Sequence, residues 1–390
     1  MKKFFIWASL VFFFLVPVSQ FLSIRLLVLL VLFSIFLFRH KSISQVFRQS
    51  WDLQLYIIVL MIGLIYSDDI VQGLKILETS FALIAVPFLF CELTYEGKSV
   101  SRYSLTSFVI GVLTACLIVF SNSAINFLTT DTFEVFQYYQ LTNILGIQPT
   151  YMAYYVILSI TYIVFELYYN TNLSPHLLTI AALFFFVILL LTGGETTFMS
   201  LVLVFSFFLL KYLLDSRSFR ETYAIVLVVI IMFGFVFVSN SSYFSSISRD
   251  KTDSWERSVL WKAAVDANPS PFLGVGTGDY KLVLNTYYTS RGLTKYANES
   301  FNSHNQFIQQ YFSNGVLGLL TLLIIIVRPL YLSFKSQNPL GILIMFPFVI
   351  YGMTEVFLGR FQGVVFFAIC HQIVVSLYYS SKQNFALKAV

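Results

Sequence analysis

The chain is built largely from continuous apolar segments whose length matches the thickness of a lipid bilayer. A spanning helix needs about 20 mostly apolar residues to cross roughly 30 Å of hydrocarbon. Only helices and closed β-barrels satisfy every backbone polar group in lipid, and barrel strands alternate in polarity, which the stretch 81–90 does not. The apolar segments lie at about residues 4–18, 21–38, 53–66, 76–90, 105–120, 151–169, 177–191, 197–214, 223–238, 307–332, 340–357 and 361–379.

Composition agrees with this pattern, because 58% of the residues are hydrophobic and 11% are charged, whereas soluble domains carry roughly 25% charged residues. A water-soluble globule is therefore excluded. We predict an all-α polytopic membrane protein with about twelve transmembrane helices. The first nine lie within residues 1–238, a large, partly helical loop follows at 239–303, and the last three lie within 304–390.

Basic residues in the short loops predict the orientation of the protein. Positive charge stays on the cytoplasmic side of a membrane, and Lys and Arg gather in alternate loops, for example at Arg39 and Arg48, while Asp68 and Asp131 lie in the others. We therefore expect a bacterial inner-membrane protein with both termini cytoplasmic and the loop 239–303 on the periplasmic face. The net charge of +5 then reflects orientation, and no nucleic-acid partner is expected.

The long loop has features of a folded segment. Over about residues 252–267 the spacing predicts a helix, with Trp255 and Ala263 on one side and Arg257 and Trp261 on another. We expect this helix to lie at the membrane surface, in contact with lipid. Arg257 presents a fork of donors that matches phosphate oxygens, although most arginines in such a place only hold lipid headgroups or pair with a carboxylate, here Glu256 or Asp253.

One histidine has a placement suited to chemistry. The others lie in cytoplasmic loops or inside the last apolar segment, at His40, His176 and His371. His304 lies outside, at the start of a predicted span, where Asn302 or Ser303 could cap the helix. A helix start favours the neutral imidazole, which can accept a proton. The alternative is a histidine that only satisfies the helix end.

Three other features have a structural explanation that we prefer. The glycine-rich stretch 274–278 lacks the preceding strand of a nucleotide-binding loop, so we predict a tight turn. Asp68 and Asp69 could hold a divalent cation, but they precede a helix and are expected to cap it. The cysteines lie in apolar segments as buried hydrophobes, at Cys91, Cys116 and Cys370.

Three segments together resemble the O-antigen ligase and O-antigen polymerase superfamily of bacterial membrane glycosyltransferases. The first runs from Arg257 to Trp261 and continues in the stretch 268–278. The second is 303–307, followed by 314–318, and the third is 352–355. The resemblance is specific over the C-terminal third of the chain and rests on hydropathy elsewhere.

The resemblance implies transfer of a glycan from an undecaprenyl-diphosphate carrier to an acceptor on the periplasmic face, with no metal and no cofactor. His304 would be the catalytic base on the acceptor hydroxyl, and Arg257 would hold the diphosphate. The acceptor would be a lipid A core, for a ligase, or a second lipid-linked glycan, for a polymerase. Further substrate-binding candidates are Trp261, Asn305, Arg291, Arg25, Arg360 and Glu355.

One position departs from the family pattern. Members often carry a Ser-Arg pair at the outer start of a span, where this chain has Glu195. Either a different basic group completes the phosphate clamp, with Arg25, Lys75, Arg291 and Arg360 as candidates, or this member binds its donor differently. The alternative from another functional class is a transporter of polysaccharide or lipid. The sequence shows no internal repeat with paired broken helices, which such transporters use, and this argues against the alternative.

Overall fold

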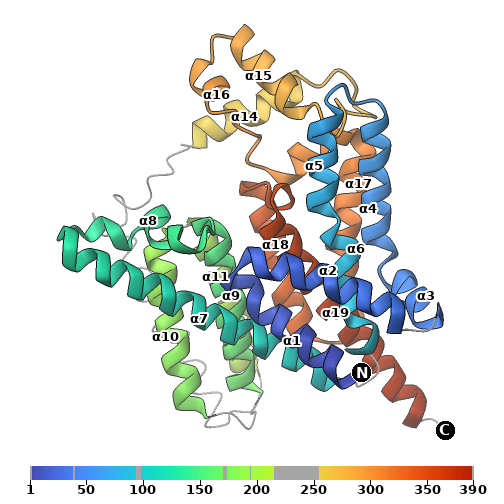
Figure 1. The fold of residues 1–390 in the computed structure, drawn as a ribbon, viewed down its shortest axis with the longest axis vertical. Coiled ribbons are helices and arrows are strands. Elements are labelled where there is room, and N and C mark those ends of the chain that lie inside the picture. The colour runs from blue at the N-terminus through green and yellow to red at the C-terminus, as the bar shows by residue number, and fades with distance from the viewer. Residues whose placement is uncertain are drawn as a thin grey trace. The chain divides into compact units, whose positions relative to one another are not determined.

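The computed structural model of the protein describes residues 2–37, 40–93, 98–169, 174–193, 195–214 and 254–388. Within these ranges the chain forms α-helices and short 3-10 helices and no strand (Figure 1). The prediction of an all-α chain is therefore confirmed.

Six helices of the described ranges are long and apolar enough to cross a membrane, namely Ile70–Phe90, Arg102–Thr130, Pro149–Tyr168, Pro175–Thr192, Gln306–Lys335 and Phe361–Ser380. Shorter apolar helices cover Lys3–Val18, Gln20–Phe36, Trp51–Ile65, Met199–Lys211 and Pro339–Thr354. The predicted segment 223–238 lies outside the described residues. The total of about twelve spans and the placement of the loop 239–303 on the periplasmic face stay predictions.

The chain divides into two compact units that interleave in sequence. The first unit comprises Met1–Lys2, Leu27–Ser101 and Thr252–Val390, and the second comprises Lys3–Leu26 and Arg102–Lys251. The helices that contribute to the second unit are α1 (Lys2–Val18), α2 (Gln20–Leu37, in part), α7 (Lys98–Thr130), η1 (Phe133–Phe136), α8 (Tyr138–Thr142), η2 (Asn143–Leu145), α9 (Pro149–Tyr168), α10 (Pro175–Thr192) and α11 (Glu195–Leu214).

In the second unit α9 is the central helix, buried along nearly its whole length and packed against α10 and α11. Buried Glu166 on α9 pairs with Arg102 on α7 at 2.5 Å. The hydroxyl of Ser107 on α7 donates to the Leu10 carbonyl of α1 at 2.6 Å. These side-chain contacts join the helices around α9.

The first unit holds most of the predicted site residues. Its helices are α3 (His40–Gln49), α4 (Trp51–Ile65), α5 (Ile70–Ser80), α6 (Ala82–Leu93), α14 (Ser254–Asp266), α15 (Tyr280–Ser290), α16 (Thr294–Asn298), α17 (Gln306–Lys335), α18 (Pro339–Thr354), η3 (Phe357–Gly359) and α19 (Phe361–Lys388). Helix α17 packs against both α4 and α18, and α19 packs against α6. Figure 1 shows α14, α15 and α16 beyond the ends of α4, α5 and α17.

Three helices of the first unit are joined by a buried carboxylate. Asp52 on α4 is fully buried and lies 2.6 Å from Nη1 of Arg328 on α17 and 2.8 Å from Nε2 of His371 on α19. Nη2 of Arg328 also donates to the Gln49 carbonyl at 2.7 Å. A buried carboxylate requires such partners, because an isolated charge is costly in an apolar interior.

Helix α17 is interrupted at Asn314 and Gly315, whose φ and ψ angles are not helical. The break frees the carbonyls of Phe312 and Ser313, which accept hydrogen bonds from the N–H groups of Val275 and Gly276, both at 2.9 Å. The predicted tight turn at 274–278 is therefore confirmed, and it supplies the hydrogen bonds that the broken helix lacks.

The segment α14 to α16 has a small core of its own. The helix predicted over 252–267 is confirmed as α14, and its buried residues Leu260, Ala263 and Ala264 pack with Tyr288 of α15 and Phe312 of α17. Trp261 is half-buried. This core was not predicted from the sequence, because the helix was expected to be a separate element on a membrane surface.

Replacing Asp52 with alanine would leave Arg328 and His371 without their shared partner. Removal of one member of a buried ion pair costs about 3–5 kcal/mol, so we expect the thermal midpoint in detergent to fall by about 10 °C. Glu134→Ala, at an exposed acid of the second unit, is the control and should leave the midpoint unchanged. An equal midpoint for both variants would contradict the stabilising role of Asp52.

Gly315→Ala tests the joint between α17 and the turn at 274–278. Gly315 has a φ of 62°, and a Cβ there would overlap the Phe272 carbonyl. We expect tryptic cleavage within 254–303 to accelerate about tenfold or more, because hydrogen bonds of about 1 kcal/mol each are strained. Gly146→Ala is the matched control, since Gly146 has the same φ and open space around it. Equal cleavage of the two variants would refute the interpretation.

Candidate active site

His304 lies immediately before the residue that caps α17. The cap is Asn305, whose side chain accepts hydrogen bonds from the N–H groups of Phe307 at 2.9 Å and Ile308 at 3.0 Å. The prediction of Asn302 or Ser303 as the cap is therefore wrong. Asn302 instead accepts a hydrogen bond from the His304 N–H at 2.8 Å, which is a local turn that Asn favours.

This turn holds His304 in a conformation that few non-glycine residues adopt. Its φ is 43°, in the left-handed region where His is more frequent than most side chains. Backbone strain of this kind costs about 1–3 kcal/mol and gathers at functional sites. Buried Ser303 anchors the turn on one side, since its N–H donates to Oε1 of Gln309 at 3.3 Å.

The imidazole of His304 faces a carboxylate. Its Nδ1 lies 3.5 Å from Oε2 of Glu355, and the two side chains are 25% and 31% exposed. The ring of Phe301 packs on the imidazole with centroids 5.6 Å apart. In the described part of the chain no residue forms a hydrogen bond to Nε2 of His304, so this nitrogen is open to a substrate.

Hydrogen bonds between α17 and the end of α18 bring Glu355 to this position. Nδ2 of Asn305 donates to the Met353 carbonyl at 3.2 Å, and the Leu358 N–H donates to Oε1 of Gln306 at 2.8 Å. Glu355 itself ends α18. The two side chains that directly follow His304 are thus hydrogen-bonded to the backbone on both sides of Glu355.

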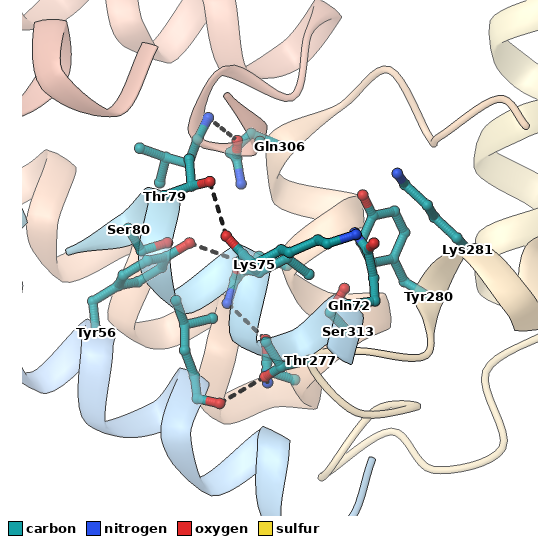
Figure 2. A pocket seen from close by; sticks show the side chains of 16 residues that line it. Tyr56, Gln72, Lys75, Thr79, Ser80, Thr277, Tyr280, Lys281, Gln306 and Ser313 are labelled. Carbon is teal, nitrogen blue, oxygen red and sulfur yellow. Dashed lines mark hydrogen bonds between the residues drawn. The ribbon is translucent and has the colours of Figure 1, made fainter. Parts of the chain in front are cut away.

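A cavity of ≈ 130 Å³ has Gln306, which follows His304 by two residues, among the residues that line it. Its wall includes Gln306 and Ser313 from α17, Gln72 and Lys75 from α5, and Tyr280 and Lys281 from α15 (Figure 2). Gly359 lines it next to the exposed Arg360. The cavity is therefore polar, and lysines lie on two of its walls.

Tyr280 lies between these basic groups. Figure 2 shows Lys75 extending toward Tyr280, and Nζ of Lys281 lies 6.0 Å from the centre of the Tyr280 ring. Burial raises the pKa of Tyr280 to about 12, although the positive charge of Arg360 acts in the opposite direction. The phenol is therefore a neutral hydrogen-bond donor at physiological pH.

Arg257 and Trp261 lie one helical turn apart on α14. Nε of Arg257 and Nε1 of Trp261 are both buried and have no hydrogen-bond partner in the described part of the chain. Glu256 pairs instead with Lys295 at 2.6 Å, so the expected alternative of a Glu256–Arg257 pair is wrong. Two buried donors without acceptors are unusual in a folded protein and are available to a ligand.

The remaining predicted residues lie apart from this arrangement or in the other unit. Arg291 ends α15, where its guanidinium lies 5.4 Å from the centre of the Tyr287 ring. Arg25 belongs to the second unit and lies 3.0 Å from the centre of the Phe21 ring. Glu195 begins α11 of that unit. Asp69 caps α5 by accepting the Gln72 N–H at 2.9 Å, as expected.

Tyr280 and Lys281 were not predicted as site residues from the sequence. Both lie at the start of α15, just after the glycine-rich turn and Asp279. The Asp279 carboxylate holds this helix start in place, because it accepts hydrogen bonds from the N–H groups of Asp68 at 2.9 Å and Asp69 at 2.7 Å. A lysine next to a family motif was a usable signal. Its proximity to Lys75, more than two hundred positions earlier, was not visible in the sequence.

No curated protein matches the chain, but a comparison with protein families gives a match. Residues 180–323 match the family model described as O-antigen ligase. The matched range contains Arg257, Trp261 and His304, and it ends before Glu355. This match agrees with the resemblance drawn from the sequence motifs, and residues 180–323 of the chain are similar to the O-antigen ligase family.

Proposed function

We propose that the protein is a membrane glycosyltransferase that moves a glycan from an undecaprenyl-diphosphate carrier to an acceptor hydroxyl on the periplasmic face. We further propose that it acts as an O-antigen ligase, with a lipid A core as acceptor. The observation that carries the proposal is the pair His304 and Glu355, in which one imidazole nitrogen faces a carboxylate and the other is open.

The pair suits the proton transfer that this reaction requires. The acceptor oxygen forms a bond to the anomeric carbon while the bond from that carbon to the diphosphate breaks. Nε2 of His304 takes the hydroxyl proton, and Glu355 stabilises the imidazolium that results. A positioned base of this kind contributes about 10²–10⁴-fold to a rate.

The leaving diphosphate requires positive charge or hydrogen-bond donors as its bond to the sugar breaks. Arg257 supports this role, since its Nε is a buried donor without a partner among the described residues. Its guanidinium fork matches phosphate oxygens. Trp261, one turn further on α14, offers a second donor of the same kind.

His304→Asn tests the base. Asparagine tolerates a positive φ but does not accept a proton at neutral pH, so we expect transfer to fall by about 10²–10⁴-fold with normal expression. The assay uses purified protein in proteoliposomes with lipid-linked donor and, in parallel, a lipid A core or a second lipid-linked glycan as acceptor. His176→Asn, at an exposed histidine of the second unit, is the control.

Two results of this assay would count against the proposal. Retained turnover in His304→Asn would remove His304 from the mechanism. Transfer by the wild type only to the second lipid-linked glycan would replace the ligase assignment with a polymerase, since the two enzymes share donor and chemistry and differ in acceptor.

Glu355→Gln tests the carboxylate beside His304. The substitution keeps size but removes the charge that stabilises the imidazolium, so we expect kcat to fall about tenfold, or about 1.4 kcal/mol, with little change in the KM for donor. Glu299→Gln, at an exposed acid of the 254–303 segment, should change neither. A raised KM with unchanged kcat would instead mean that Glu355 contributes to substrate binding only.

A further inference from the structure

The cavity that Gln306 lines carries several hydrogen-bond donors. Lys75 and Lys281 contribute ammonium groups, and Tyr280 contributes a neutral phenol. Oε1 of Gln306 already accepts the Leu358 N–H, so the group that Gln306 has left for a ligand is its NH₂ donor. A ligand that fills this cavity must therefore supply acceptors.

The positive charges at the cavity have no acidic partner within the described residues. Lys75, Lys281 and Arg360 form no ion pair there, although Lys75 and Lys281 line the cavity and Arg360 follows one of its wall residues, Gly359. Asp279, the acid nearest to Lys281 in sequence, is occupied on both oxygens by the N–H groups of Asp68 and Asp69. The local excess of positive charge favours an anion.

The backbone fixes where these groups lie. Asp69 caps α5 six residues before Lys75, and Asp279 attaches the start of α15 to Asp68 and Asp69. The lysines therefore extend from two helices whose starts are hydrogen-bonded to each other. Such preorganisation lowers the cost of ordering two flexible side chains around a ligand.

We propose that Lys75 and Lys281, together with Tyr280 and the amide of Gln306, bind a phosphate-bearing group, and that this group is the diphosphate of the lipid-linked donor. A multiply charged ligand whose oxygens only accept hydrogen bonds matches this set of donors. The assignment to the donor rests on the proposed function: Gln306 lies two residues after His304, and the acceptor hydroxyl and the leaving diphosphate both lie at the anomeric carbon that reacts.

The two lysines would then supply the positive charge that is missing at Glu195. Arg257 on α14 is not among the residues that line the cavity, so the phosphate site proposed here draws on α5, α15 and α17. The same cavity could instead hold a phosphate of an acceptor or of a membrane phospholipid, which has the same chemistry but comes from another source.

A binding experiment separates these sources without requiring turnover. The His304→Asn protein is placed in nanodiscs with Lys75→Gln, Lys281→Gln or both, and equilibrium binding of undecaprenyl diphosphate, undecaprenyl monophosphate and phosphatidylglycerol is measured. We expect each single substitution to weaken undecaprenyl diphosphate binding about tenfold, and the pair more, because a hydrogen bond to a charged group is lost. Phosphatidylglycerol binding should change little.

Lys262→Gln, at an exposed lysine of α14 outside the cavity, is the matched control and should bind all three lipids normally. Unchanged diphosphate binding in the double variant would overturn the proposal, and so would an equal loss for all three lipids, which would identify a general headgroup site.

The same variants with His304 restored distinguish this proposal from the proposed function. If the wild type transfers no glycan but the lysine variants still lose diphosphate binding, the site stands and the glycosyltransferase assignment fails. If the wild type transfers glycan and the double variant binds and transfers equally well, the glycosyltransferase assignment stands and the lysine site is refuted.

Discussion

The break in α17 determines where the candidate site lies. Within a membrane protein every freed backbone group needs a partner inside the protein, and the interruption at Asn314 and Gly315 frees two carbonyls. Val275 and Gly276 satisfy both. Because these residues come from the turn that precedes α15, the same two hydrogen bonds that complete the broken helix also bring the start of α15 to the wall of the cavity.

Side chains around the break extend this connection to α4. Thr277 donates from its hydroxyl to the Leu60 carbonyl at 2.7 Å and accepts from Nδ2 of Asn314 at 2.8 Å. The amide of Gln310 donates to Oδ1 of Asn314 at 3.0 Å and accepts from the Tyr56 hydroxyl at 2.9 Å. The polar residues of this part of α17 are thus satisfied in a connected network, which makes the interface specific to one register.

Local patterns in the sequence were sufficient for the helices, for the tight turn at 274–278 and for the cap at Asp69, since each depends on neighbouring residues. The position of His304 at the start of a helix also followed from its neighbours. The cap itself was assigned to the wrong residue, because Asn302, Ser303 and Asn305 are all good caps, and only the approach of Met353 to Asn305 selects between them.

Long-range partners could not be predicted from one sequence. Asp52, Arg328 and His371 are far apart in the chain and form one buried cluster. Lys75 and Lys281 line one cavity for the same reason, which is that helices distant in sequence pack together. Hydropathy identifies such charges as unusual in an apolar segment, but it does not identify their partners.

The two contact regions between α4 and α17 explain how a site with strained and charged parts can be held in place. Near one end of the pair, Asp52 of α4 binds Arg328 of α17, and near the other end Thr277 connects Leu60 of α4 to Asn314 of α17. A helix pair fixed at both ends resists both sliding and rotation. Because the first turn of α17 carries both the residues that orient His304 and the cavity residue Gln306, fixing this helix pair holds the proposed base and the proposed anion site at a constant separation, as a reaction in which one bond forms while another breaks requires.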